Sequence, residues 1–357
     1  LEVRQSDPYN RGLLWPQRFA VTLCGERDSV LRVNMTDTLV RIQLPFVPSL
    51  VLPNTDGRGY GLFVPDESAL KWLLAHWWEV KDDTARQSLL MTLYENYLAK
   101  HISADDWTNS LLAGLPAEKN ALVASTVSGY LAGAMRRVAP AQIAEVEARV
   151  YAISRNHPLP SCRVQLLRYF MQNATSQPMV KELYALWQEQ SDKRLNQQDY
   201  TTLAYELAIR LPAESEQILR TQRARIDDPD RLRQFDFISR SVVSDTARLD
   251  TLFNSLLVAE NRRIEPWTAA VIRYLNHPLR EEQSVKYIRP GLEVLEEVQR
   301  TGDIFFPKNW ASALLGNHLS RPAYEEVVRF LDAHPDYSPL LKNKILQAAH
   351  SLYREND

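Results

Sequence analysis

Glycine and cysteine are both scarce in this chain of 357 residues. Only eleven glycines and two cysteines are present, whereas there are eight tryptophans. Few glycines and many large packing side chains favour long helices over a loop-rich sheet protein. The cysteines, Cys24 and Cys162, lie far apart in the sequence and in different expected domains, so we expect two free thiols.

An excess of either charge and a long apolar run are also lacking. The 42 basic and 44 acidic residues give a net charge of −2, and no basic stripe is present, which excludes nucleic-acid binding through bulk charge. No apolar run approaches the roughly 20 residues of a membrane helix, and no signal peptide begins the chain. We therefore expect a soluble protein, cytoplasmic or periplasmic. The length suits about two domains.

The usual catalytic and metal-binding motifs are absent. None of the seven histidines is followed by Glu and no two are four residues apart, so the zinc motif H-E-x-x-H does not occur. Neither G-x-S-x-G nor the Gly-Lys-Ser/Thr of a P-loop is present. We expect no catalytic, metal-binding or cofactor-binding residue in this chain. His157 and His277 each precede a proline, where we expect them to meet the carbonyl end of a helix.

Residues 1–65 have the period-two pattern of strands. Apolar and polar residues alternate in 19–23 and 40–44, and turn residues separate these segments. They predict a small antiparallel β-sandwich. Asn54-Thr55-Asp56-Gly57 is interpreted as a hairpin turn between 50–52 and 60–64. A phosphate-binding loop at 57–61 is disfavoured, because the third glycine falls one residue early for G-x-G-x-x-G and no helix follows directly.

Residues 66–357 change to the helical period of 3.6. Pro65-Asp66-Glu67-Ser68 carries helix-start signals, and an apolar stripe within 89–98 predicts a helix capped near Asp82 or Asp83. Residues 121–135 contain many small side chains, which predicts a central helix with close neighbours. Proline-marked breaks recur at Pro140, 156–160, 211–212, 228–229, 276–279 and 333–335. Short helices between such breaks predict an α/α solenoid of helical pairs.

Two motifs in the first domain resemble a known family. Trp15-Pro16-Gln17-Arg18-Phe19 and Asn54-Thr55-Asp56-Gly57-Arg58-Gly59-Tyr60-Gly61 are similar to the C-terminal half of the zinc aminopeptidases of the aminopeptidase N family. A looser resemblance covers Arg86 to Trp107. The resemblance implies a small β-sandwich followed by a HEAT-like α-helical superhelix. The sequence departs from the family at Gly59-Tyr60-Gly61-Leu62, where the family has a strand similar to Gly-Tyr-Tyr-Arg.

The resemblance also implies a function. The chain would be the noncatalytic C-terminal portion of a zinc-dependent metallopeptidase that removes N-terminal residues from peptides, and would itself be inactive. The zinc would lie in a catalytic domain outside this chain. Its partners would be that domain and the peptide substrate, and its role would be to close the substrate chamber and stabilise the catalytic domain. The alternative is a free-standing helical-repeat scaffold for protein interactions.

Three groups of side chains are candidates for binding or catalysis, and in each the pattern favours a structural role. An arginine run suits carboxylate binding, but interspersed acids favour a solvated face: Arg220, Arg223, Arg225, Arg231 and Arg233. Trp77 and Trp78 lie near Trp72, His76 and Val80, whose spacing is that of an ordinary helix stripe, which favours packing in the core or against the sandwich over an aromatic platform. Paired carboxylates at predicted helix starts favour capping over acid or base chemistry: Asp105-Asp106, Glu281-Glu282 and Glu325-Glu326.

Overall fold

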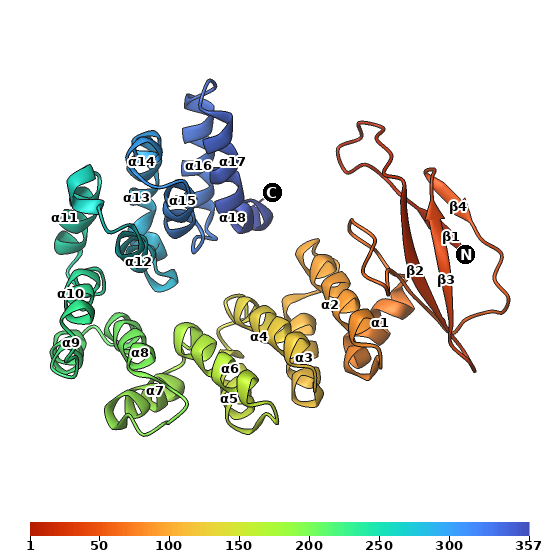
Figure 1. The fold of residues 1–357 in the computed structure, drawn as a ribbon, viewed down its shortest axis with the longest axis horizontal. Coiled ribbons are helices and arrows are strands. Elements are labelled where there is room, and N and C mark those ends of the chain that lie inside the picture. The colour runs from red at the N-terminus through yellow and green to blue at the C-terminus, as the bar shows by residue number, and fades with distance from the viewer. Residues whose placement is uncertain (357) are drawn as a thin grey trace. The chain divides into compact units, whose positions relative to one another are not determined.

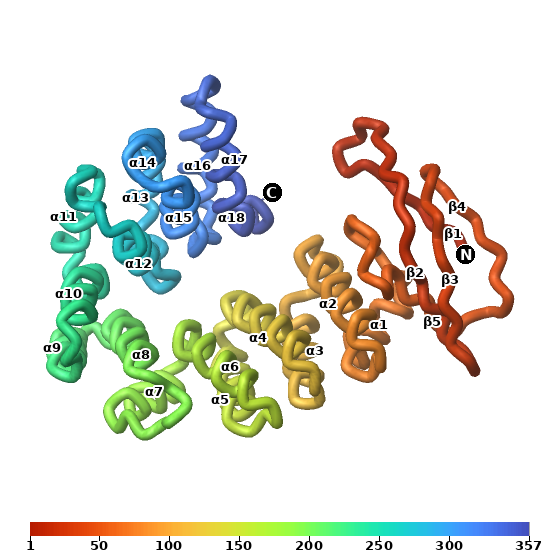
Figure 2. The backbone as a smooth tube through the Cα atoms, viewed as in Figure 1, coloured from red at the N-terminus to blue at the C-terminus, as the bar shows by residue number. Residues whose placement is uncertain are grey.

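A computed structural model of the chain describes residues 1–356. All of its strands lie within residues 1–65, here called the β module: β1 (Glu2–Arg4), β2 (Gln17–Cys24), β3 (Ser29–Met35), β4 (Leu39–Arg41) and β5 (Leu50–Leu52). They form an antiparallel three-stranded sheet in the order β3-β2-β5 and an antiparallel pair of β1 with β4. Figure 2 shows β5 beside β2.

One small core joins the two sheets. On β2, Phe19, Val21 and Leu23 are buried, as the period-two pattern predicts. Val3 of β1 and Val40 of β4 pack against them from the second sheet. Both sheets therefore turn an apolar face inward, which is how a short antiparallel module acquires a core.

The hairpin predicted around Asn54 is wrong in its second strand. Gly57 adopts a left-handed φ of 66°, and its N–H donates to the Asn54 carbonyl at 3.0 Å, so the turn itself is present. Residues 60–64 form no strand. The side chain of Asn54 accepts from the Gly59 N–H at 2.7 Å and donates to its carbonyl, which closes the loop on itself. Strand β5 pairs with β2 instead.

Helices make up most of the chain from Glu67 onward. The chain divides into two compact units, residues 1–179 and 180–357. The first contains the β module and the helices α1 (Glu67–His76), α2 (Asp83–Leu98), α3 (Ala104–Gly114), α4 (Ala121–Met135), α5 (Ile143–Asn156) and α6 (Pro160–Asn173). In Figure 1, α2, α4 and α6 form one row and α1, α3 and α5 form another. The helices of this unit are thus paired in two layers.

The β module is tied to the first helices by buried polar contacts. The hydroxyl of Ser88 on α2 donates to the carbonyl of Asn54 at 2.5 Å, and the amide of Asn96 donates to the carbonyl of Phe63 at 2.7 Å. Both side chains are buried. A buried polar group without a hydrogen bond would destabilise the folded state. These contacts therefore hold the loop 54–63 against α2.

The second unit contains only helices and the loops that connect them within its described residues. After α7 (Gln177–Glu189), which crosses the boundary, it contains α8 (Gln197–Arg210), α9 (Ser215–Arg223), α10 (Pro229–Ile238), α11 (Thr246–Leu256), α12 (Glu265–Leu275), α13 (Glu281–Glu293), α14 (Leu295–Thr301), α15 (Phe306–Leu315), α16 (Arg321–Ala333), α17 (Pro339–Ala348) and α18 (His350–Asn356). Short 3₁₀ turns link several of them. One continuous apolar core runs from Tyr205 to Leu352.

Carboxylates from one helix cap the start of a later one in both units. Glu147 on α5 is fully buried and accepts from the N–H groups of Thr175 and Ser176, just before α7. Glu281 on α13 accepts from the N–H groups of Leu319 and Ser320, just before α16. Helix starts leave N–H groups without intrahelical partners, and these two acids supply the missing acceptors.

Most helix boundaries lie where the sequence predicts them. The helix over 121–135 has those bounds, α2 is capped by Asp82, and the helices break at the proline-marked positions. Leu341, Ile345, Ala348 and Leu352 recur at helical spacing, but a turn at Ala349 divides them between α17 and α18. Among residues 1–356, no helix combines the length and apolar character needed to cross a bilayer.

Candidate functional site

Two members of the arginine run are neutralised by acids. Arg223 donates to both carboxylate oxygens of Asp236, at 2.7 and 2.8 Å, and Arg233 pairs with Asp230 one turn away. Both pairs are exposed to solvent, and in each the acid offsets the charge of the guanidinium. The interpretation as a solvated face therefore holds for Arg223 and Arg233.

Arg225 has a structural role. Its guanidinium donates to the carbonyls of Trp187 at 2.9 Å and Gln188 at 3.1 Å, which lie at the end of α7. It also lies over the Trp187 ring, 4.8 Å from the ring centre. Carbonyls at a helix end lack intrahelical donors, so Arg225 serves as a cap for α7. Its guanidinium is not available to a ligand.

Arg231 differs from the other members because it lines a cleft between α8 and α10. Its Nη1 donates to the side-chain oxygen of Gln197 at 3.1 Å. The amide nitrogen of Gln197 in turn donates to the Arg225 carbonyl at 2.7 Å, which fixes the orientation of that amide. No carboxylate among residues 1–356 pairs with Arg231. Its positive charge is held in place by a neutral partner.

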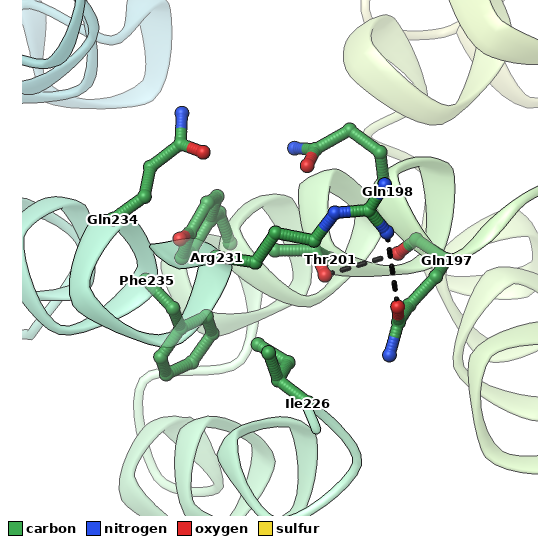
Figure 3. A pocket seen from close by; sticks show the side chains of 8 residues that line it. Gln197, Gln198, Thr201, Ile226, Arg231, Gln234 and Phe235 are labelled. Atoms are coloured by element: carbon green, nitrogen blue, oxygen red, sulfur yellow. Dashed lines mark hydrogen bonds between the residues drawn. The ribbon is translucent and has the colours of Figure 1, made fainter. Parts of the chain in front are cut away.

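Two further glutamine amides lie at the same cleft. Figure 3 shows Gln198 and Gln234 on opposite sides of the Arg231 side chain, with Phe235 and Ile226 beneath. Neither glutamine side chain bonds to another residue among residues 1–356. Each offers one acceptor and two donors, the groups that pair with a peptide bond.

The cleft is shallow. Its volume of about 10 Å³ is the space that a single water needs, so no side chain of a ligand would be engulfed. An extended peptide lying across the surface could instead present a carbonyl or carboxylate to Arg231 and a backbone amide to Gln198 or Gln234. We call this surface, Arg231 with Gln197, Gln198 and Gln234, the amide cleft. Sequence reasoning found Arg231 but not the glutamines, because glutamine is common on any helix surface.

The predicted capping histidines share a local structure but differ in their second contact. In both Asn-His-Pro-Leu motifs, the histidine Nδ1 accepts from the N–H two residues on, at 3.1 Å for His157 and 3.2 Å for His277. The Nε2 of His157 lies 2.9 Å from the carbonyl of Leu115, at the end of α3. The Nε2 of His277 meets the carboxylate of Glu206 at 3.2 Å. The prediction that the ring of His277 contacts a carbonyl at a helix end is therefore wrong.

The other candidates are structural. Trp77 is fully buried and lies edge-on to Trp78, as core packing predicts. Asp106 bonds with Ser103 at the start of α3, and Glu281 caps α16. Glu325 and Glu326 pair with arginines on their own helix, α16. None of these groups is left facing a cavity as an acid or base.

Exposed apolar side chains gather on one part of the β module. Tyr60 is 90% exposed, and Trp15 is 40% exposed. The Tyr60 N–H donates to the side chain of Gln17 at 2.8 Å, which brings segment 60–64 beside segment 13–17. The large exposed apolar residues on these two segments are Leu13, Leu14, Trp15, Tyr60, Leu62 and Val64, here called the β-module patch.

Within residues 1–356, no three His, Cys, Asp or Glu side chains are placed to hold a metal ion. No protein-family model and no curated protein sequence matches the chain. The amide cleft and the β-module patch therefore have to be interpreted from their own chemistry.

Proposed function

We propose that the chain is the noncatalytic C-terminal portion of a zinc aminopeptidase, and that the β-module patch docks on the catalytic domain. The order of parts, a small β module followed by paired helices, supports this proposal together with the residue motifs at Trp15–Phe19 and Asn54–Gly61. In this proposal the helices form a HEAT-like superhelix that closes the substrate chamber. The zinc and its ligands belong to the catalytic domain.

The observation that carries the proposal is the composition of the β-module patch. A module with so small a core seldom leaves several large apolar side chains in water without a partner. The Trp15-to-Phe19 motif that resembles the family runs from this patch into β2. The same residues thus provide both the resemblance and the apolar surface.

The amide cleft fits the second part of the proposal, in which the helices hold peptide. Its amide and guanidinium groups bind any peptide backbone or terminal carboxylate without selecting a side chain. An aminopeptidase that accepts many sequences needs contacts of this kind away from its N-terminal residue pocket.

The docking claim is tested by joining this chain to the rest of the enzyme. Co-expression with the catalytic domain, or production of the intact protein, should yield zinc-dependent release of N-terminal residues and an interface above about 1,000 Å². The double variant Trp15→Ser/Tyr60→Ser should weaken that association at least about tenfold, since central aromatic anchors dominate interfaces. Val30→Ser is the matched control, because Val30 is 66% exposed on β3 of the same module but lies outside the patch.

The scaffold alternative gives a different result in the same experiment. If the gene encodes no H-E-x-x-H segment, or if the two parts stay separate when made together, the aminopeptidase proposal is rejected and a free-standing interaction scaffold is favoured. The isolated chain should bind no stoichiometric zinc and release no amino acid from reporter substrates. One tightly held zinc per chain in metal analysis would also contradict the proposal.

A further inference from the structure

A second surface, in the unit 180–357, combines a pocket with protruding apolar side chains. The pocket lies between the 3₁₀ turn Ala259–Arg262, the starts of α12 and α15, and the end of α14. Its volume is about 290 Å³. An apolar cavity of about 150 Å³ can hold benzene, so this pocket has room for an aromatic side chain. The buried ring of Phe306 contributes to its wall.

The two loops that border the pocket are held together. Glu265, at the start of α12, accepts from the N–H of Asp303 at 2.8 Å. The Asp303 carboxylate in turn accepts from the N–H groups of Phe305 and Phe306 and so caps α15. These hydrogen bonds join the segment 302–306 to the start of α12 at the pocket.

Large apolar side chains protrude beside this pocket. Ile304 is 82% exposed and Phe305 is 66% exposed, and both lie between two pocket-lining residues, Gly302 and Phe306. Val258 and Ile264, on the other loop, are 49% and 47% exposed. Val258 and Ile264 are chain neighbours of the pocket-lining residues Ala259, Arg263 and Glu265, so exposed apolar residues adjoin the pocket on both loops.

The pocket also contains one free charge of each sign. Glu260 and Arg263 both line it and both are exposed. Neither makes a hydrogen bond or an ion pair with any of residues 1–356. Arg262, by contrast, is buried and paired with Glu297 at 2.6 Å. The surface therefore combines the pocket, the exposed Phe305 side chain, an unpaired acid (Glu260) and an unpaired base (Arg263).

We propose that this surface is the interface of a homodimer, occupied by a second copy of the chain. A two-fold interface has to be self-complementary, because the same patch supplies both sides. Here Phe305 of one copy enters the pocket of the other, and Glu260 of each copy faces Arg263 of its partner. A partner surface with charges of only one sign would leave either Glu260 or Arg263 without an opposite charge. A second copy supplies an opposite charge to both. The proposal does not depend on the proposed aminopeptidase function.

The first test measures the mass of the chain in solution. Sedimentation velocity over a concentration series should show a monomer–dimer equilibrium. Phe305→Asp should weaken the dimer at least about tenfold, because it removes the aromatic anchor and places a carboxylate beside Glu260 and Glu265 in the partner's pocket. Leu340→Asp is the matched control: Leu340 is 68% exposed on α17 of the same unit and should leave the equilibrium unchanged. Thermal unfolding checks that both variants are folded.

The second test exchanges the free charges. Arg263→Glu alone and Glu260→Arg alone should each weaken the homodimer, since each places like charges opposite one another. An equimolar mixture of the two variants should form heterodimers in preference to either homodimer, because every facing pair then has opposite charges. The double variant should dimerise as wild type does.

Three results would overturn the proposal. The first is a chain that stays monomeric up to about 100 μM, a concentration at which any specific dimer of micromolar affinity is populated. The second is a dimer that Phe305→Asp leaves intact. The third is a mixture of charge variants in which heterodimers are no more abundant than the homodimers.

Discussion

The Nε2 atom of His277 lies 3.2 Å from Oε2 of Glu206, across 71 positions of sequence. Both side chains are buried, and Arg210 donates to the same carboxylate oxygen at 2.7 Å. Burial raises the pKa of Glu206, but the Arg210 charge and the His277 contact lower it by more, so its net pKa lies below the usual range. The carboxylate is therefore charged in the core and links α8 to the turn after α12.

Removing this carboxylate should destabilise the second unit. Glu206→Leu removes the carboxylate that both Arg210 and His277 contact, and loss of one member of a buried pair typically costs about 3–5 kcal/mol. Glu206→Gln should cost less, because the amide oxygen can still accept from His277. Urea unfolding measures both values. Glu216→Leu, at an exposed position on α9, is the control and should change the free energy of unfolding by less than about 0.5 kcal/mol.

Glu281 should make stability depend on pH in the acid range. Burial raises its pKa, but the His318 ring and the N–H groups of Ser320 and Leu319 outweigh that effect and lower the pKa from 4.5 to about 2. A lowered folded-state pKa adds stability above the unfolded pKa, and this contribution is lost as pH falls toward 2.

The matching variant is Glu281→Gln, which keeps an oxygen for the two N–H groups but has no charge to lose. Its free energy of unfolding should fall below that of wild type above about pH 5 and converge with it near pH 2. Glu282→Gln, at the exposed neighbouring position, should leave the wild-type pH profile in place. A constant gap between wild type and Glu281→Gln at all pH values would contradict the pKa assignment.

Two helical glycines should respond to alanine with opposite signs. A Cβ at Gly114 would lie 2.3 Å from the Trp77 ring and 2.5 Å from that of Trp78, so Gly114→Ala should cost about 1–3 kcal/mol. A Cβ at Gly133 on α4 meets nothing within 4 Å, so Gly133→Ala should stabilise by about 0.5–1 kcal/mol through helix propensity. Thermal or urea unfolding of both variants measures the two changes in the free energy of unfolding. Changes of the same sign would contradict the described surroundings of Gly114 or Gly133.

Helix α4 illustrates what the sequence could and could not predict. Its bounds match the range predicted from its small side chains, and Asn120 caps its first turn. The small residues divide by face: Ser128 is buried against Cys162 at 3.6 Å, whereas Gly129 and Gly133 face open space. Composition indicated close packing for all of them, because only the tertiary structure distinguishes one face from another.

The amide cleft and the interhelical caps could not be predicted for a related reason. Arg225 and Arg231 are six residues apart in one polar run, yet one caps α7 and the other lines the cleft. Glu147 reaches residues 28 and 29 positions later, a spacing that no motif records. Such roles depend on which helix ends meet in space, and a single sequence contains no signal for that.

The turn at Gly57 gives a prediction in the β module. Its φ of 66° lies in the left-handed region, where a β-branched side chain is strained. Gly57→Val should therefore cost about 1–3 kcal/mol, whereas Gly57→Asn should cost less because asparagine tolerates this conformation. Differential scanning calorimetry of the two variants gives the comparison. A valine variant that melts with wild type would place φ at Gly57 in the ordinary region.

Arg231 provides the test of the amide cleft. In the enzyme assembled with its catalytic domain, Arg231→Ala should raise KM for long peptides by about tenfold, since charge-assisted hydrogen bonds typically contribute about 1.5–3 kcal/mol. It should leave a single-residue reporter substrate unaffected, because that substrate would not extend to the cleft. Arg233→Ala, two residues away and already paired with Asp230, is the matched control and should change neither KM. A loss of reporter turnover in Arg231→Ala would indicate a structural role, and unchanged KM for every peptide length would remove the cleft from the proposed peptide path.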